Sequence, residues 1–438
     1  MKSFLKSLFR IRRGQITENI LQKLEEISNL IIEGEYDEAK AQLENARKIA
    51  QKQKDSQSII DINVMKATIY FRQGEYQEAK KLAKEAHASA LVESYRFGMA
   101  SALHRISAIH LVLGDLESAK TTAKTAAEIF FELNEPEREA ESLSNLGIIH
   151  KMAGDYTNAI ECYSQAFDRI TGLGSPSEGA VLTNIGELYV LIGNYKEGEN
   201  VLTKAVELSK EADNKYVLSI ALNNLAHLNV LISRYDEAVS FITEALELAR
   251  QLGAAYDIGG FLLTKAWINW SLGANNNAFN LLKEGMGRWE KIGSKEWTYY
   301  ETKFLIAAIQ MDLKNEAEAF QDLKIAQEIA KQAPAELKER LTIIKPFFEA
   351  YIHQRSGKTE EAKTNYLECI QKAREAKEFY YLAQSLLHIA ELYLKSYLKA
   401  GNVDELDKMR EAIEEVVKTA EEKKIYSLIV ETKILRSE

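Results

Sequence analysis

The sequence predicts an all-α protein built as one continuous solenoid of stacked helix pairs. Two observations lead to this fold class: a six-residue signature that recurs about every 40 residues, and small side chains at fixed positions relative to it. A period of this length indicates equivalent units that are each too small to bury their own apolar face, so neighbouring units must stack. The 438 residues have room for two or three ordinary domains, but the repeat indicates a single array without linkers.

The signature usually begins with glycine, has tyrosine at its third position and ends with a small residue. The clearest copies begin at Gly34, Gly74, Gly114, Gly154, Gly193 and Ser233, and weaker copies begin at Gly273, Lys314, Gly357 and Gly401. A glycine just past an apolar run is a helix C-cap, and an acidic residue after it is favourable at the next helix N-terminus. Each unit is therefore predicted to be an antiparallel helix pair. In the fourth unit the helices are expected over residues 138–152 and 156–170.

Small residues recur at two positions of the second helix. The first set is Ala39, Ala79, Ala119, Ala159, Gly198, Ala238, Ala278, Ala319 and Ala362, and the second, seven residues later, is Ala46, Ala86, Ala126, Ala166, Ala205, Ala245, Gly285, Ala326 and Cys369. Seven residues are two helical turns, so both sets lie on one helix face. We expect helices to approach each other closely along this face.

These features resemble the tetratricopeptide-repeat (TPR) family. Its pattern of Leu-Gly, Tyr, Gly-x-Tyr, Ala and Ala is matched by residues 145–147, Tyr70 or Tyr189, residues 154–156, Ala159 and Ala166. The resemblance covers about residues 20–400 and implies a right-handed superhelical solenoid of about nine to ten helix pairs. The units are longer than the ordinary TPR of about 34 residues, and in that they are similar to repeats of kinesin light chains, spindle adaptors and bacterial peptide sensors.

The two ends are predicted to differ from the solenoid, which we expect over residues 20–421 with about ten repeats, the last three irregular. Residues 1–19 form a basic amphipathic extension, and residues 422–438 a C-terminal capping helix that covers the last apolar face. Residues 1–13 carry five basic residues and no acidic one. Such a segment can make weak contact with a membrane surface or enter a partner's groove; alternatively it is frayed or packs on the first repeat.

Composition argues against several classes of function. The net charge is −9, and an acidic solenoid lacks the clustered Lys and Arg that nucleic-acid binding needs, so we expect no nucleic acid as partner. Two cysteines and no apolar run long enough to span a membrane indicate a reducing, cytoplasmic setting. No catalytic constellation or metal-ligand spacing is present among the seven histidines. We therefore predict no enzyme activity, metal or cofactor.

The first helix of each unit lines the concave surface, as the TPR resemblance implies, and its polar positions are the candidate peptide-binding residues. Counting back from the signatures gives a row of polar side chains, His104, Arg105, Asn145, Thr183, Asn184, Asn223 and Asn224, and a further set one turn later, Glu187, His227 and Trp267. Side-chain amides and hydroxyls offer donors and acceptors to the backbone of an extended peptide. The alternative is that the asparagines stabilise helix packing within the repeat.

Trp267 and Trp270 complete the candidate site. They lie three residues apart in the first helix of the seventh unit, and tryptophan is enriched at binding hot spots. The alternative is that they fill space where the repeat becomes irregular.

These patterns favour a non-enzymatic protein-protein interaction adaptor or scaffold that binds a peptide segment of a partner in the concave groove. An alternative is a ligand- or peptide-responsive regulator that controls a separate effector protein, because residues 1–19 are too short for an effector domain. A structural subunit with its convex face buried in an assembly stays open as well.

Overall fold

The computed structural model describes residues 18–423 except for residues 174, 176, 293–296, 334 and 377. The predicted N-terminal extension and C-terminal capping helix therefore lie almost entirely outside the described residues. The membrane-surface contact of residues 1–13 stays a prediction. None of the helices in the described part is long and apolar enough to cross a membrane.

The described residues form ten antiparallel helix pairs, and no strand occurs among them. The first helices of the pairs are α2 (Glu18–Glu33), α4 (Ser56–Arg72), α6 (Arg96–Val112), α8 (Pro136–Met152), α10 (Glu178–Leu191), α12 (Lys215–Leu231), α14 (Ala255–Ser271), α16 (Trp297–Asp312), α18 (Ala335–Arg355) and α20 (Phe379–Ala400). The second helices are α3 (Tyr36–Lys52), α5 (Tyr76–Val92), α7 (Leu116–Glu132), α9 (Tyr156–Ile170), α11 (Tyr195–Glu211), α13 (Tyr235–Gln251), α15 (Asn275–Ile292), α17 (Glu316–Lys331), α19 (Thr359–Ala376) and α21 (Val403–Lys423). The predicted all-α solenoid of helix pairs is confirmed.

The turns explain the 40-residue period. Each of α4 to α7 has 17 residues, and three residues separate consecutive helices. Gly74, with φ of 79°, donates its N–H to the Phe71 carbonyl, and the N–H of Glu75 bonds to the Tyr70 carbonyl. This pair of bonds is a Schellman C-cap, which requires a left-handed residue. The turn between units repeats the geometry without glycine, because Ser94 has φ of 50°.

The small residues lie where the helices of a pair meet. Both sets are buried throughout the solenoid. A glycine of the first helix allows the closest approach: a Cβ atom on Gly147 would lie 2.5 Å from the Tyr163 ring, and one on Gly186 would lie 2.5 Å from the Leu202 side chain. Contacts this short cannot be accommodated without movement, so glycine is needed at this position of the Leu-Gly element.

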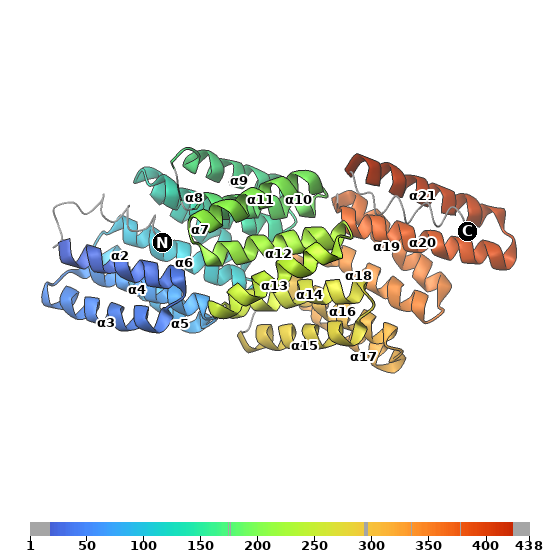
Figure 1. The fold of residues 1–438 in the computed structure, drawn as a ribbon, viewed down its shortest axis with the longest axis horizontal. Coiled ribbons are helices and arrows are strands. Elements are labelled where there is room, and N and C mark those ends of the chain that lie inside the picture. The colour runs from blue at the N-terminus through green and yellow to red at the C-terminus, as the bar shows by residue number, and fades with distance from the viewer. Residues whose placement is uncertain are drawn as a thin grey trace.

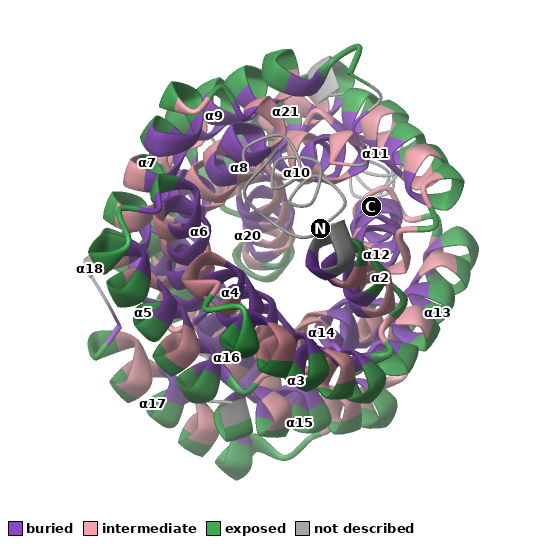
Figure 2. Ribbon diagram, turned by 90° about the vertical axis from the view of Figure 1, so that its left-hand side faces the viewer, coloured by how far each residue is buried: buried purple, intermediate pink, exposed green. Residues whose placement is uncertain are grey.

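The pairs stack into a superhelix that is elongated along one axis (Figure 1). Viewed from its end, the chain forms a ring, with α4, α6, α8, α10, α12 and α14 inside and α5, α7, α9, α11, α13 and α15 outside (Figure 2). The inner helices are largely buried, whereas green, exposed residues follow the outer helices. In the second to seventh units the first helix therefore faces inward, as expected.

Successive turns of the superhelix contact each other. Helix α2 of the first unit packs on α12 of the sixth. A Cβ atom on Gly34 would lie 2.8 Å from Leu252, and the Arg72 guanidinium lies 5.0 Å from the centre of the Tyr216 ring. The fifth and tenth units meet in the same way, with the rings of Tyr195 and Phe379 6.1 Å apart. Successive turns of the superhelix therefore touch at both places.

Candidate functional site

A cavity lies on the inner side of the N-terminal half of the superhelix. The cavity has a volume of about 530 Å³, and its wall is formed mainly by α4, α6, α8, α10, α12 and α14. Ligand sites of proteins generally occupy about 300 to 1,000 Å³. The cavity is therefore large enough for a few residues of an extended peptide or for a ligand of similar size.

Eight of the predicted site residues line this cavity. They are His104, Arg105, Asn145, Thr183, Asn184, Glu187, Asn223 and Asn224. They come from four consecutive first helices, α6, α8, α10 and α12. Equivalent positions on stacked helices face the same axis, which explains why residues about 40 apart in sequence converge.

Several polar atoms of this wall lack a partner within the protein. The Asn223 amide donates to Asn224 Oδ1 at 3.4 Å, which leaves Asn223 Oδ1 and Asn224 Nδ2 without a hydrogen bond among the described residues. Ser101 and Ser144 also line the cavity, and their hydroxyls likewise have no hydrogen-bond partner among the described residues. Unpaired buried polar groups are costly. These atoms themselves are shielded from solvent, so their unpaired state is a cost within the wall.

Other polar residues of the wall are already bonded to the protein. Thr183 donates its hydroxyl to the Gly179 carbonyl at 2.7 Å. Asn145 Nδ2 lies 3.5 Å and Ser142 Oγ lies 3.1 Å from His104 Nδ1. Burial, followed by the charges of Arg138 and Arg105, lowers the pKa of His104 to about 3. His104 is therefore neutral at physiological pH.

Charged residues in the cavity are mostly paired. Arg138 forms an ion pair with Glu141, and Lys151 Nζ lies 2.5 Å from Glu187. Burial alone would raise the pKa of Glu141, but the charge of Arg138 lowers it to about 2. Sequence reasoning did not find Arg138, Glu141 or Lys151. They do not recur at one position of the repeat, so the spacing carried no signal for them.

Arg105 differs from the other cations of the wall. Its guanidinium lies 5.1 Å from the centre of the Phe71 ring, and its Nε has no hydrogen-bond partner among the described residues. No carboxylate of the described residues forms an ion pair with Arg105. Burial and the charges of Arg72 and Arg138 lower the pKa of Arg105 to about 10.

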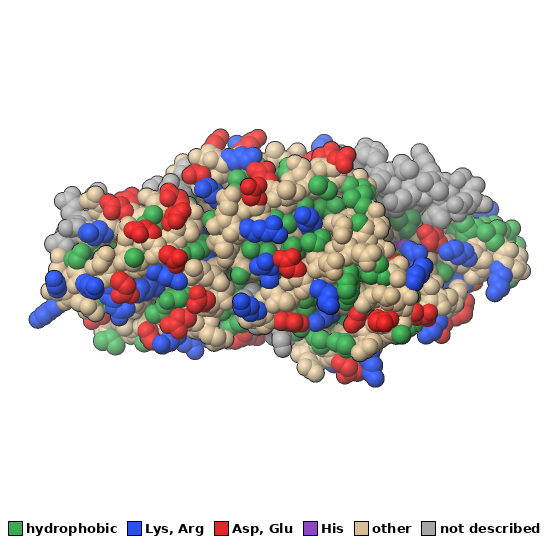
Figure 3. All heavy atoms as spheres, turned by 60° about the horizontal axis from the view of Figure 1, so that its bottom comes forward, with side chains coloured by type: hydrophobic (Ala, Val, Ile, Leu, Met, Phe, Trp, Pro, Cys, Tyr) green, Lys and Arg blue, Asp and Glu red, His purple; other side chains and the backbone are tan. Residues whose placement is uncertain are grey.

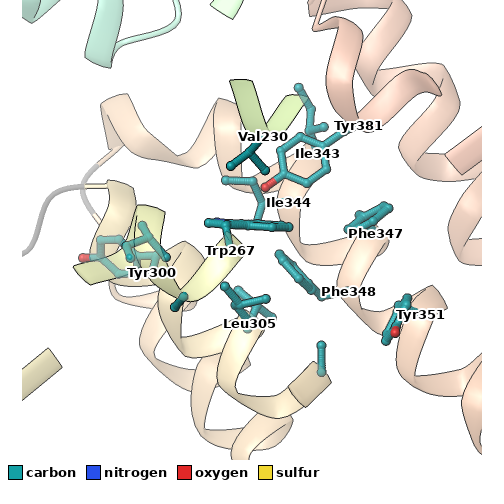
Figure 4. Packing of buried hydrophobic residues seen from close by; sticks show 14 of the residues in the cluster. Val230, Trp267, Tyr300, Leu305, Ile343, Ile344, Phe347, Phe348, Tyr351 and Tyr381 are labelled. Atoms are coloured by element: carbon teal, nitrogen blue, oxygen red, sulfur yellow. The ribbon is translucent and has the colours of Figure 1, made fainter. Parts of the chain in front are cut away.

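The remaining predicted residues, His227, Trp267 and Trp270, do not line the cavity. Trp267 lies among side chains of α16, α18 and α20 in the C-terminal core, close to Phe348 and Tyr381 (Figure 4). Trp270 donates Nε1–H to Asp312 Oδ2 at 2.7 Å. We therefore leave the two tryptophans out of the proposed site.

The described residues contain no group of three His, Cys, Asp or Glu side chains that could hold a metal ion. On the face shown in Figure 3, Lys and Arg alternate with Asp and Glu, and no basic stripe follows that surface.

Comparison with known proteins shows which families and structures this chain is similar to. The family described as tetratricopeptide repeat matches residues 98–171 and 177–251, and the family described as anaphase-promoting complex subunit 5 matches residues 27–70 and 263–397. A search of curated proteins gives no match. The helix pairs, their Schellman turns and the inward-facing polar row define an α-solenoid of the repeat type. The match supports tetratricopeptide repeats over residues 98–171 and 177–251 of this chain.

Two solved structures show the same fold over most of the chain. A Rap protein complexed with competence and sporulation factor has a TM-score of 0.60 at 15% identity, over 85% of this chain and 99% of that one. The Rap conjugation gene regulator of plasmid pLS20, solved in complex with the Phr* peptide, has a TM-score of 0.53 at 16% identity, over 83% and 97% of the two chains. At this identity the similarity concerns the fold.

Proposed function

We propose that this protein is a non-enzymatic interaction scaffold that holds a short, extended peptide segment of a partner protein in the inner cavity. The observation that carries the proposal is the row of asparagines from α8, α10 and α12, with unpaired amide atoms at its α12 end. Amide side chains can pair with both the N–H and the C=O groups of a peptide backbone. The asparagines that line the cavity would thus bond to the backbone of the bound segment.

The comparisons support a peptide as the ligand. The pLS20 regulator, which has the same fold, was solved with a peptide. The two cysteines of this chain are both free and buried, which supports a cytoplasmic location.

A peptide-responsive regulator of a separate effector is the second candidate function. It is favoured by the contacts between superhelical turns beside the cavity, such as Arg72 over the Tyr216 ring, since both residues also line the cavity. A ligand that displaced either residue would change how the turns pack. Small-angle X-ray scattering with and without peptide separates the two functions, because a scaffold keeps its radius of gyration and a regulator changes it.

Selection from a displayed library of random seven-residue peptides tests the proposal. We expect the wild type to enrich a set of peptides from this library. These peptides should bind the double variant Asn184→Ala/Asn224→Ala at least tenfold more weakly than the wild type, because two backbone-binding amides are lost. Asn200→Ala is the matched control, since Asn200 is exposed on the outer helix α11. Equal binding to the wild type and the double variant would show that the cavity is not the binding surface.

A further inference from the structure

Two buried carboxyl groups contact the same tyrosine at the N-terminal end of α20. The hydroxyl of Tyr381 donates to Glu301 Oε1 of α16 at 2.5 Å, and the backbone N–H of Tyr381 donates to Glu378 Oε2 at 3.1 Å. Glu301 is 6% exposed, Glu378 is 5% exposed, and the ring centres of Tyr381 and Phe347 lie 5.1 Å apart. Burial among apolar groups disfavours the charged form of a carboxyl group. Both groups therefore lie where a negative charge is unfavourable.

The two carboxyl groups differ in their partners. Glu378 caps α20, and the backbone N–H groups of Tyr380 and Tyr381 stabilise its charged form. Glu301 accepts a hydrogen bond from the Tyr381 hydroxyl, and no Lys or Arg among the described residues forms an ion pair with it. A buried carboxylate without a paired charge is costly. Glu301 is therefore the member of the pair that more readily holds a proton.

Arg340 of α18 supplies positive charge to this cluster, but its charge acts on both carboxyl groups. Burial raises the pKa of Glu301, the Tyr381 hydrogen bond and the charge of Arg340 lower it, and the charge of Glu378 raises it again. The result is a pKa above the ordinary value of glutamate. One guanidinium cannot neutralise two carboxylates, so ionisation of Glu301 would set its charge against that of Glu378.

The same cluster joins separate turns of the superhelix. Phe379 directly follows Glu378, and its ring centre lies 6.1 Å from that of Tyr195 of the fifth unit. Arg340 reaches the hydroxyl of Tyr156 of the fourth unit. A movement of the first turn of α20 would therefore change the contact between the fifth and tenth units.

Other titratable groups at this junction keep one charge state between pH 5.5 and pH 8. Burial lowers the pKa of His227 of α12 to about 4. Burial and then the charge of Glu378 raise the pKa of Tyr195, and burial and then the charge of Glu301 raise the pKa of Tyr381. Of these groups, the carboxyl pair is therefore the one that changes charge in this range.

We propose that Glu301 holds a proton while α20 is packed against α16, and that loss of this proton loosens the first turn of α20 and its contact with the fifth unit. The shape of the superhelix then responds to pH, whether or not a peptide is bound. The packed form binds the proton more tightly than a solvated glutamate, whose pKa is about 4.3. Packing is therefore most favourable below that pH and weakens as the pH rises through the raised value.

Distances between spin labels on the fifth and tenth units test this proposal. The labels are placed on Asn200→Cys of α11 and Glu411→Cys of α21 in the full chain, since both positions are exposed and Cys162 and Cys369 are buried. We expect the distance distribution, measured by double electron–electron resonance, to broaden toward longer distances between pH 5.5 and pH 8 and to recover when the pH is lowered again. Glu301→Gln imitates the protonated carboxyl group and should keep the narrow distribution at both pH values.

Unfolding by urea separates this role from simple packing. At pH 5.5 the wild type and Glu301→Gln should have the same midpoint, whereas at pH 8 the midpoint of the variant should be higher because it buries no charge. Tyr381→Phe removes the hydrogen bond that lowers the pKa of Glu301, so the loosening of this variant should begin at a higher pH. Glu290→Gln is the matched control, because Glu290 is an exposed carboxylate on α15 and pairs with Lys303.

Two results would overturn the inference. A wild-type distance distribution that is the same at both pH values would mean that the junction does not respond to protons. A response that persists in Glu301→Gln would show that another group carries it. Neither result bears on peptide binding, because the inference does not rest on that function.

Discussion

Arg340 of α18 donates a hydrogen bond to the hydroxyl of Tyr156 of α9 at 3.0 Å, although the two residues are 184 positions apart in the sequence. Tyr156 is the tyrosine of the fourth signature, and Arg340 belongs to the ninth unit. The bond therefore joins one turn of the superhelix to the next. Arg340 is 7% exposed, and the charges of Tyr156, Glu378 and Glu301 raise its pKa although burial would lower it.

Removing this bond should weaken the contact between turns. Tyr156→Phe deletes only the hydroxyl, and a hydrogen bond to a charged group contributes about 1.5 to 3 kcal/mol. We expect a decrease of that size in the free energy of unfolding, measured with denaturant. Tyr235→Phe is the control, because Tyr235 holds the same signature position on α13 and its hydroxyl has no hydrogen bond to any of the residues that the structure describes. Equal stability of the two variants would mean that the bond is not formed in solution.

Glycine in the first helix should be needed for packing rather than for backbone conformation. Gly186→Ala places a Cβ atom 2.5 Å from the Leu202 side chain, and overpacking of a core costs about 1 to 3 kcal/mol. Gly287→Ala should instead stabilise the protein, since Gly287 lies on the exposed side of α15 and a Cβ atom added there would meet no neighbouring element within 4 Å. Alanine is better than glycine in a helix by about 1 kcal/mol. Thermal unfolding of both variants checks the signs, and a neutral Gly186→Ala would contradict this packing.

Stability should fall as the pH is lowered, partly because of His104. Its pKa in the folded protein is about 3, whereas an unfolded histidine has a pKa of about 6.5. The unfolded chain therefore takes up a proton first, and the loss of stability begins below about pH 6.5 and continues toward pH 3. His104→Asn cannot be protonated and keeps a polar atom near Ser142. Between pH 6.5 and 4, the unfolding free energy of this variant should depend less on pH than that of the wild type; parallel curves would exclude the contribution of His104.

Trp267 should affect stability and leave peptide binding alone. Its ring is 8% exposed and lies 5.9 Å from the ring of Tyr380. Trp267→Ala creates a cavity in the C-terminal core, which costs about 3 to 5 kcal/mol. Denaturant unfolding measures this loss, and peptide titration of the folded variant should give the wild-type affinity. A variant that keeps its stability and loses peptide affinity would return Trp267 to the binding surface.

The predicted helix boundaries of the fourth unit agree with the structure within two residues, since residues 138–152 and 156–170 were expected and α8 and α9 span Pro136–Met152 and Tyr156–Ile170. Local signals explain this accuracy, because the Schellman turn at Gly154 needs a left-handed residue and Asp155 caps the next helix by accepting from the Asn158 N–H. The inward direction of Asn184 also follows from its position in the repeat.

Other features could not be found by counting positions. Arg138, Glu141 and Lys151 pair only because neighbouring helices bring them to one wall, and each occurs once rather than in every unit. Trp267 holds a position that faces the axis, yet the units of the C-terminal half surround it. The position of a residue in the repeat predicts which way its side chain points, and the packing of the surrounding units determines which residues it contacts.

The sequence by itself determined the helix pairs, their turns and the inward face of each unit, because these depend on residues within one or two repeats. Only the tertiary structure decided that Gly34 meets Leu252, that Tyr156 meets Arg340, and that the inner surface closes into a cavity. The pitch of a superhelix is the sum of small rotations between neighbouring units. No single repeat encodes that sum, so contacts five units apart appear only when the whole coil is assembled.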